Sequence, residues 1–165
     1  MGKEIERIRP IELPRLILSI LICQAAGALG SIFTSSSVST WYPTLTKPDF
    51  TPPGWVIGLV WIILFTLMGI SLFVVWQRGT GRTEVKSALF IFAAQLVVNV
   101  LWSWAFFGLR SPLFGLEVIA VLWILILLTI VKFWQISRIA ALLLIPYILW
   151  VSFAAFLNFT IWRLN

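Results

Sequence analysis

Charged residues are so sparse in this chain that they divide it into long apolar stretches. Four stretches contain no charged residue and a fifth contains only Glu117: residues 16–46, 50–77, 87–109, 139–162 and 111–131. A membrane-spanning helix needs about 20 mostly apolar residues, so each stretch holds one helix and none holds two. The spacing predicts an all-α integral membrane protein, a bundle of five transmembrane helices near residues 14–35, 53–77, 84–108, 112–133 and 138–162.

Composition supports this class and excludes two others. Of the 165 residues, 61% are hydrophobic and 11% are charged, whereas soluble domains have roughly 45–50% apolar and about 25% charged residues. A chain this short has too much surface to hide such an excess from water. With 15% aromatic residues, it also differs from disordered chains. We therefore expect residues 1–165 to form a single membrane domain, whose longest connection is the loop 36–51.

The positive charges are distributed unevenly between the two sides of the predicted bundle. Nine of the twelve lie on the side of the N-terminus: Lys3, Arg7, Arg9, Arg15, Arg78, Arg82, Lys86, Lys132 and Arg138. The other side has only Lys47, Arg110 and Arg163. By the positive-inside rule, the N-terminus is cytoplasmic and the C-terminus lies outside. The net charge of +6 then reflects topology, and we expect no nucleic-acid partner. An inner or plasma membrane fits this bias, while an outer or organellar membrane stays open.

The first predicted helix has features of a signal peptide and of a close-packed helix, and the last contains a proline. Basic residues followed by an apolar run and the tripeptide 26–28 are also typical of a cleavable signal peptide. The run continues through Phe33, which favours a retained helix. Small residues over 25–31 predict close packing of this helix within the protein or, alternatively, between two copies. In the last helix, Pro146 should cause a kink.

The residues of conventional catalytic and metal sites are missing. The sequence contains no histidine, which removes the usual general base and the commonest metal ligand. A haem iron therefore cannot be held by an axial histidine. The one cysteine, Cys23, is expected to be a small buried residue. Glu117 is an ionisable residue inside a predicted span, and such residues are functional by default. Alternatively, its side chain extends to the membrane interface or pairs with Arg110. We predict no metal site and no required cofactor.

Aromatic, amide and glycine residues recur at helical spacing in three predicted helices. Steps of three and four residues place each set on one helix face: Gly54, Gly58, Trp61 and Phe65; Gln95, Asn99, Trp102 and Phe106; Tyr147, Trp150, Ala154 and Asn158. Amides are costly in hydrocarbon unless they are hydrogen-bonded, so these faces should point inward. They line an apolar cavity with a few polar groups, or the amides only join helices. Spacing alone supports both alternatives equally.

The tryptophans fall into two groups by depth. Four lie at span ends and fit an interfacial belt: Trp41, Trp76, Trp134 and Trp162. Four lie deeper and do not fit it: Trp61, Trp102, Trp123 and Trp150. The deeper set includes residues on the same helix faces as Asn99 and Asn158, which is the pattern expected of a ligand site.

Three groups of residues occur in a recognisable order. The first comprises Trp41-Tyr42-Pro43-Thr44-Leu45-Thr46-Lys47-Pro48, Phe50-Thr51-Pro52-Pro53 and Gly58-Leu59-Val60-Trp61. The second comprises Gln95-Leu96, Asn99, Trp102-Ser103 and Phe106-Phe107-Gly108, and the third Pro146-Tyr147, Trp150, Phe153-Ala154 and Leu157-Asn158. Together they resemble the first loop and the second, third and fifth helices of the TspO/MBR family. That family comprises the tryptophan-rich sensory proteins of bacteria and the mitochondrial translocator protein (peripheral benzodiazepine receptor).

The resemblance implies a five-helix bundle, commonly a homodimer, with a ligand pocket beneath the first loop. Family ligands include tetrapyrroles such as protoporphyrin IX and haem, synthetic benzodiazepine-type compounds and, in animals, cholesterol. Phe159 stands where the family's cholesterol motif has tyrosine, which argues against sterol recognition. With the helix faces, the resemblance gives ten expected ligand-binding residues: Tyr42, Pro43, Trp61, Phe65, Asn99, Trp102, Trp150, Ala154, Leu157 and Asn158.

Three functions follow as hypotheses. The first is a membrane receptor or sensor that binds porphyrin, haem or another lipophilic ligand between its helices and has a role in porphyrin or stress regulation. The second is a light- and oxygen-dependent porphyrin-degrading enzyme, for which the resemblance implicates Trp61 and Trp150. The third is transport of a porphyrin or sterol-like solute, although the sequence shows no inverted repeats. The expected location is a bacterial cell membrane.

Overall fold

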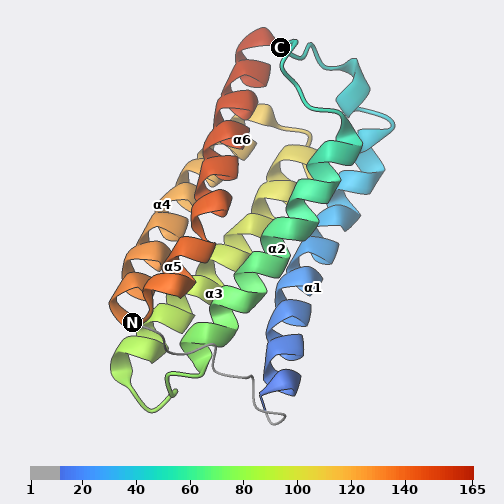
Figure 1. Ribbon diagram of the computed structural model, residues 1–165. Coiled ribbons are helices and arrows are strands. Elements are labelled where there is room, and N and C mark those ends of the chain that lie inside the picture. Colours follow the sequence, from blue (N-terminus) through green and yellow to red (C-terminus); the bar gives the residue numbers. More distant parts are fainter. Residues whose placement is uncertain (1–11) are drawn as a thin grey trace.

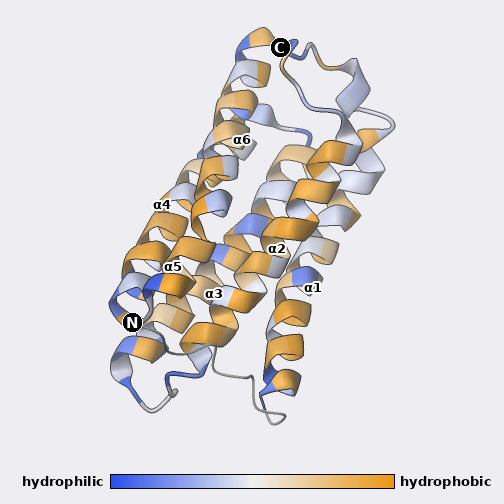
Figure 2. Ribbon diagram, viewed as in Figure 1, coloured by the Kyte–Doolittle hydropathy of each residue, from blue (hydrophilic) through white to orange (hydrophobic). Residues whose placement is uncertain are grey.

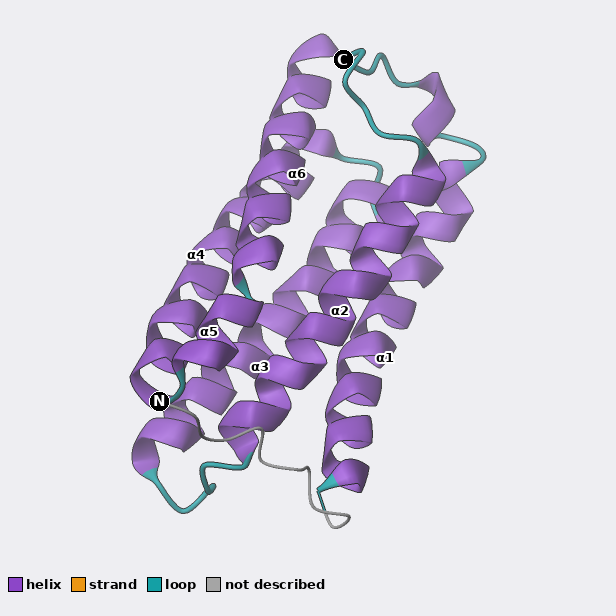
Figure 3. Ribbon diagram, viewed as in Figure 1, coloured by secondary structure: helices purple, strands orange, loops and turns teal. Residues whose placement is uncertain are grey.

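The fold is all-helical over residues 12–165, which are the residues described by a computed structural model (Figures 1 and 3). The elements in chain order are α1 (Leu13–Val38), η1 (Tyr42–Thr44), α2 (Gly54–Trp76), α3 (Thr83–Ser103), η2 (Trp104–Gly108), α4 (Pro112–Ile136), α5 (Arg138–Leu143) and α6 (Ile145–Leu164). They form five spans that are long and apolar enough to cross a membrane. The predicted five-helix membrane bundle is confirmed, and the chain is a multi-pass integral membrane protein.

The helices pack side by side into an elongated bundle (Figure 1). Helix α3 packs on α4, α1 packs on α2 and α3, and α6 packs mainly on α4. Apolar residues dominate the spans, and hydrophilic residues gather at their ends (Figure 2). The start of α1, the α2–α3 loop and the α4–α5 junction share one end, and the C-terminus and the long first loop share the other (Figure 1). Of the nine basic residues assigned to the first end, Lys3, Arg7 and Arg9 lie outside the described residues.

The first loop is shorter than predicted because α1 continues to Val38. Ser35 and Ser36 donate side-chain hydrogen bonds to the carbonyls of Ile32 and Phe33, at 3.1 and 3.0 Å. Such bonds to the preceding turn let serine remain in a helix rather than end it. The connection therefore spans residues 39–53 instead of 36–51.

The last span is interrupted next to Pro146, where the sequence predicts a kink, so the expected helix over 138–162 consists of two helical segments. Helix α5 ends at Leu143 and α6 begins at Ile145, with Leu144 between them. Pro146 is the second residue of α6. Its missing N–H costs nothing in the first turn of α6, but it cannot donate the hydrogen bond that would continue the helix from α5. The interruption lets α5 pack on α2 while α6 packs on α4.

The third span ends in a π-helical turn, η2. The N–H of Leu109 donates to the carbonyl of Trp104 at 2.8 Å, five residues back. The wider turn presents Phe106 and Phe107 together, with ring centroids 4.8 Å apart. Single π-helical turns are rare and concentrate at functional sites, and this one borders the cavity described below.

Small residues let α1 approach its neighbours closely. A Cβ added at Gly27 would lie 2.6 Å from the ring of Phe65, and one at Gly30 would lie 3.0 Å from Ser103 Oγ. At Gly69 on α2, an added Cβ would lie 2.5 Å from the backbone of Ile20. The small residues of α1 are therefore used for packing within the protein. Cys23 is buried in the core, as predicted.

Candidate ligand cavity

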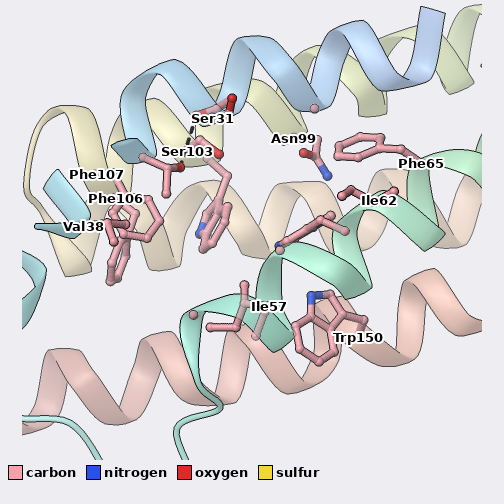
Figure 4. Close-up of a pocket in the computed structure, with 18 of the residues that line it drawn as sticks. Ser31, Val38, Ile57, Ile62, Phe65, Asn99, Ser103, Phe106, Phe107 and Trp150 are labelled. Atoms are coloured by element: carbon pink, nitrogen blue, oxygen red, sulfur yellow. Dashed lines mark hydrogen bonds between the residues drawn. The ribbon is translucent and has the colours of Figure 1, made fainter. Parts of the chain in front are cut away.

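A cavity of about 580 Å³ lies in the half of the bundle next to the first loop. Its walls come from α1, α2, α6 and the α3–η2 segment, and Tyr42 of the loop contributes above them. Figure 4 shows side chains from these elements converging on one space. The lining is mainly apolar, with a few amide and hydroxyl groups, which is the usual construction of a small-molecule site.

Nine of the ten expected ligand-binding residues line this one cavity: Tyr42, Trp61, Phe65, Asn99, Trp102, Trp150, Ala154, Leu157 and Asn158. Pro43 is the exception; it lies in η1 and is not part of the lining. The three predicted helix faces, on α2, α3 and α6, thus border one common cavity. Their role in binding a ligand stays a prediction.

A chain of buried polar groups forms one side of the cavity. Asn99 Nδ2 donates to the hydroxyl of Tyr147 at 2.8 Å, and that hydroxyl donates to Gln95 Oε1 at 2.8 Å. All three side chains are buried, with Asn99 alone reaching the cavity lining. Buried amides are stable in an apolar bundle only when hydrogen-bonded. The chain joins α3 to α6 and fixes the orientation of the Asn99 amide.

A second polar contact links the other predicted amide to a cavity indole. Trp102 Nε1 donates to Asn158 Oδ1 at 3.2 Å, and Asn158 Nδ2 donates to the carbonyl of Pro112 at 2.7 Å. Asn158 is buried against the start of α4. These amides therefore join helices and also border a cavity.

Indole and phenyl rings dominate the wall. Trp61 lies 6.4 Å from Trp102 and 5.6 Å from Phe65, measured between ring centroids. On α6, Trp150 lies 5.4 Å from Phe153. The Nε1 atom of Trp150 is buried without a hydrogen-bond partner. Trp123, the fourth deep tryptophan, is not part of the lining.

The loop end of the cavity is closed by aromatic contacts and one hydrogen bond. Trp41 and Tyr42 place their rings 5.7 and 6.4 Å from Phe106, and Ser37 Oγ donates to the carbonyl of Phe107 at 2.6 Å. Burial raises the pKa of the Tyr42 hydroxyl above its ordinary value of 10.0, since the charged form loses hydration. The loop therefore lies directly over the cavity.

Two polar side chains hold the loop in shape. Lys47 Nζ donates to the carbonyls of Tyr42 and Leu45 at 2.8 and 3.0 Å and lies 4.8 Å from the centroid of the Tyr42 ring. The amide of Asn165 joins both backbone groups of Thr46: its Oδ1 accepts from the N–H and its Nδ2 donates to the carbonyl, each at 2.9 Å. The loop is thereby tied to the end of α6.

Sequence reasoning missed the wall contributed by α1. Gln24, Gly27, Ser31 and Thr34 line the cavity, and their spacing of three and four residues was visible. We interpreted small residues there as packing positions only. These residues both pack against neighbouring helices and line the cavity, because small side chains leave volume beside the helix.

One expectation about an ionisable group, Glu117, can be compared with the structure over residues 12–165. Glu117 is exposed on α4, and no ion pair is found between Glu117 and Arg110, both of which lie within residues 12–165. The described residues contain no cluster of three Cys, Asp or Glu side chains that could hold a metal.

Comparisons with known proteins agree with this architecture. The profile of the TspO/MBR family matches residues 19–163. The chain is 49% identical to the Tryptophan-rich protein TspO of Chlorobaculum tepidum over 150 residues, covering 91% of this chain and 95% of that protein. It is 47% identical to the Tryptophan-rich protein TspO of Archaeoglobus fulgidus over 152 residues, covering 92% and 97%. Identity to the human Translocator protein is 36% over 138 residues, covering 83% and 82%. The chain belongs to the TspO/MBR family.

Proposed function

We propose that this protein is a membrane receptor or sensor that binds a flat, lipophilic tetrapyrrole in the cavity. The observation that carries the proposal is the convergence of Trp61, Trp102 and Trp150, from three different helices, on one apolar space. Its volume of about 580 Å³ falls in the range of about 300–1,000 Å³ that is typical of small-molecule sites. A relative in Cereibacter sphaeroides is named a Tryptophan-rich sensory protein, which supports a sensing role.

The chemistry of the wall favours a large aromatic ligand. Each well-placed ring pair contributes about 0.5–1.5 kcal/mol beyond the burial of apolar area. The Asn99 amide lies at the edge of the space, so a ligand with a few polar groups on a flat apolar body fits best. Because the chain contains no histidine, we expect contact with the porphyrin ring to dominate and ligation of iron to contribute little.

Titration tests this proposal. The purified protein in detergent is titrated with protoporphyrin IX and, separately, with haem, and tryptophan fluorescence is followed. We expect saturable quenching by both ligands, with the metal-free porphyrin binding at least as tightly. A strong requirement for iron would refute the proposed mode of binding, and the absence of saturable quenching would refute the function.

Light-dependent oxidation of the bound porphyrin is a second candidate, favoured by the indoles of Trp61 and Trp150 in the cavity wall. The porphyrin would absorb the light, molecular oxygen would be the oxidant, and the protein would position the ring. An illuminated arm of the titration, with a dark control, follows the porphyrin absorbance bands. If Trp61→Phe and Trp150→Phe leave the rate of band loss unchanged, the indoles take no part and this candidate fails.

The orientation and assembly of the protein are also proposals. We place the end of the bundle that carries Arg78, Arg82 and Lys86 in the cytoplasm and the C-terminus outside a bacterial cell membrane. A fluorescent protein that folds only in the cytoplasm should stay dark when fused after Asn165; bright fusions would reverse the assignment. We further expect a homodimer, to be tested by chemical cross-linking in membranes, where a monomer alone would contradict it.

A further inference from the structure

A second apolar hollow, of about 430 Å³, lies along the line where α2 and α6 face each other, which we call the α2–α6 seam. Its lining is entirely apolar apart from one indole: Val60, Ile63, Leu64, Pro146, Leu149, Trp150 and Phe153. Leu149 is 64% exposed and Ile63 is 50% exposed, so this outer hollow opens to the outside of the bundle. Both belong to membrane spans. The outer hollow therefore opens to lipid hydrocarbon.

Only one layer of side chains separates the outer hollow from the cavity. Trp150 and Phe153 line both spaces. Their ring centroids lie 5.4 Å apart, and we call this pair of rings the partition between the two spaces. Figure 4 shows Trp150 of α6 beside α2, on the side of Ile57. If these two rings moved aside, the two spaces would become one passage.

The seam is held more weakly than the α1–α2 boundary of the cavity. Within residues 12–165, no hydrogen bond joins α2 to α6, and their backbones barely approach each other. The α1–α2 boundary, in contrast, is bridged by Gln24 Nε2, which donates to the carbonyl of Ile62 and to Thr66 Oγ1 at 3.0 Å each. The interruption at Leu144 explains the difference, since α5 packs on α2 and α6 is free to diverge from it.

The partition itself lacks a polar anchor. Trp150 Nε1 is buried without a partner, and an unsatisfied donor of this kind costs free energy rather than fixing the ring. On α2, the cavity-lining residue Gly58 is exposed, and a Cβ added there would meet no atom within 4 Å. The alternative route to the cavity would pass beneath the first loop, and that loop is held by hydrogen bonds of Ser37, Lys47 and Asn165.

We propose that the ligand reaches the cavity from the bilayer through the α2–α6 seam, with Trp150 and Phe153 as the gate. The proposal rests on the proposed function and adds the route by which a lipophilic ligand arrives. A ligand that partitions into hydrocarbon then needs no aqueous path, and the loop can stay closed during binding. Leu149 lies outside the cavity at the mouth of this passage, so it controls the rate of passage without touching the bound ligand.

Stopped-flow fluorescence in lipid vesicles tests the route, with protoporphyrin IX as the probe. Leu149→Trp fills the outer hollow, and we expect the association and dissociation rates to fall together by about tenfold, with an unchanged dissociation constant. Leu149→Ala widens the mouth and should raise both rates. Val121→Trp, on the exposed face of α4 at 52% exposure, is the matched control and should leave both rates unchanged.

A loop variant separates this route from its competitor. Asn165→Ala releases Thr46 and should leave the rates unchanged if the ligand passes through the seam. The proposal is overturned if Asn165→Ala accelerates both rates while neither Leu149 variant changes them, since the ligand would then pass beneath the loop. Absence of saturable binding to the wild-type protein at equilibrium would instead refute the proposed function.

Discussion

Gly58 offers a way to fill the cavity without disturbing the fold. It lies on the cavity side of α2, and a Cβ built there would meet nothing within 4 Å. In Gly58→Leu the new side chain therefore enters open space. Glycine inside a helix costs roughly 1 kcal/mol relative to a good helix former. The variant should consequently melt at or above the temperature of the wild-type protein.

The same substitution should weaken ligand binding strongly. Extra methylenes forced into an occupied apolar site typically cost about 1–3 kcal/mol, which corresponds to about 5- to 150-fold in the dissociation constant. The assay is the protoporphyrin IX titration, accompanied by thermal unfolding in the same detergent. Stability and binding should thus change in opposite directions.

Gly69→Ala is the matched control on the same helix. Its Cβ would lie 2.5 Å from Ile20 Cα and 2.9 Å from Ile20 N, both backbone atoms. Since backbone cannot yield cheaply, the melting temperature should fall. Our reasoning about the cavity is refuted if Gly58→Leu binds porphyrin like the wild-type protein while remaining folded, because the added side chain would then not share space with the ligand.

Three further predictions concern the groups around the cavity. Tyr147→Phe leaves the buried amides of Gln95 and Asn99 without their shared partner and should cost about 1–3 kcal/mol of stability; an unchanged melting temperature would contradict the polar chain. Asn165→Ala should increase proteolysis within the loop 39–53 in detergent, whereas Arg163→Ala should not. The raised pKa of Tyr42 means that its protonated form favours the closed loop; this stabilisation is complete below the ordinary value of 10.0 and is lost as the pH rises toward the higher folded value. Melting temperature measured against pH should therefore fall above 10.0 in the wild-type protein and less so in Tyr42→Phe.

The spans could be predicted because membrane insertion imposes a simple rule on the sequence. Helices must be long, apolar and free of charge, so the charged residues mark their ends. Asn99 and Asn158 could be placed inside for the same reason, since an amide facing lipid would be unsatisfied. The break at Leu144 was only partly visible: Pro146 indicated a kink, but the position at which the new helix begins depends on how α5 packs against α2.

Other features depend on contacts that no local pattern encodes. The π-helical turn at Trp104–Gly108 is a property of how one helix end meets its neighbours, and nothing in its five residues distinguishes it from an α-helical end. Asn165 and Thr46 meet although 119 positions separate them in the sequence. Trp123 was grouped with the cavity indoles by depth, yet its Nε1 donates to Ser152 Oγ at 2.8 Å, away from the cavity. Depth in the membrane does not specify which neighbour a side chain faces.

Whether the ligand binds among the cavity indoles is best decided by comparing Trp61 with Trp123, two tryptophans in different membrane spans. Trp61→Ala removes a ring from the cavity wall, whereas Trp123→Ala removes a ring that also lies within a membrane span but outside the cavity. Protoporphyrin IX affinity is measured for both variants, with thermal unfolding as the check on folding. We predict that Trp61→Ala weakens binding by at least about 30-fold, the loss of a contact worth roughly 2 kcal/mol, and that Trp123→Ala leaves it within about twofold. Equal affinities in the two folded variants would contradict the account.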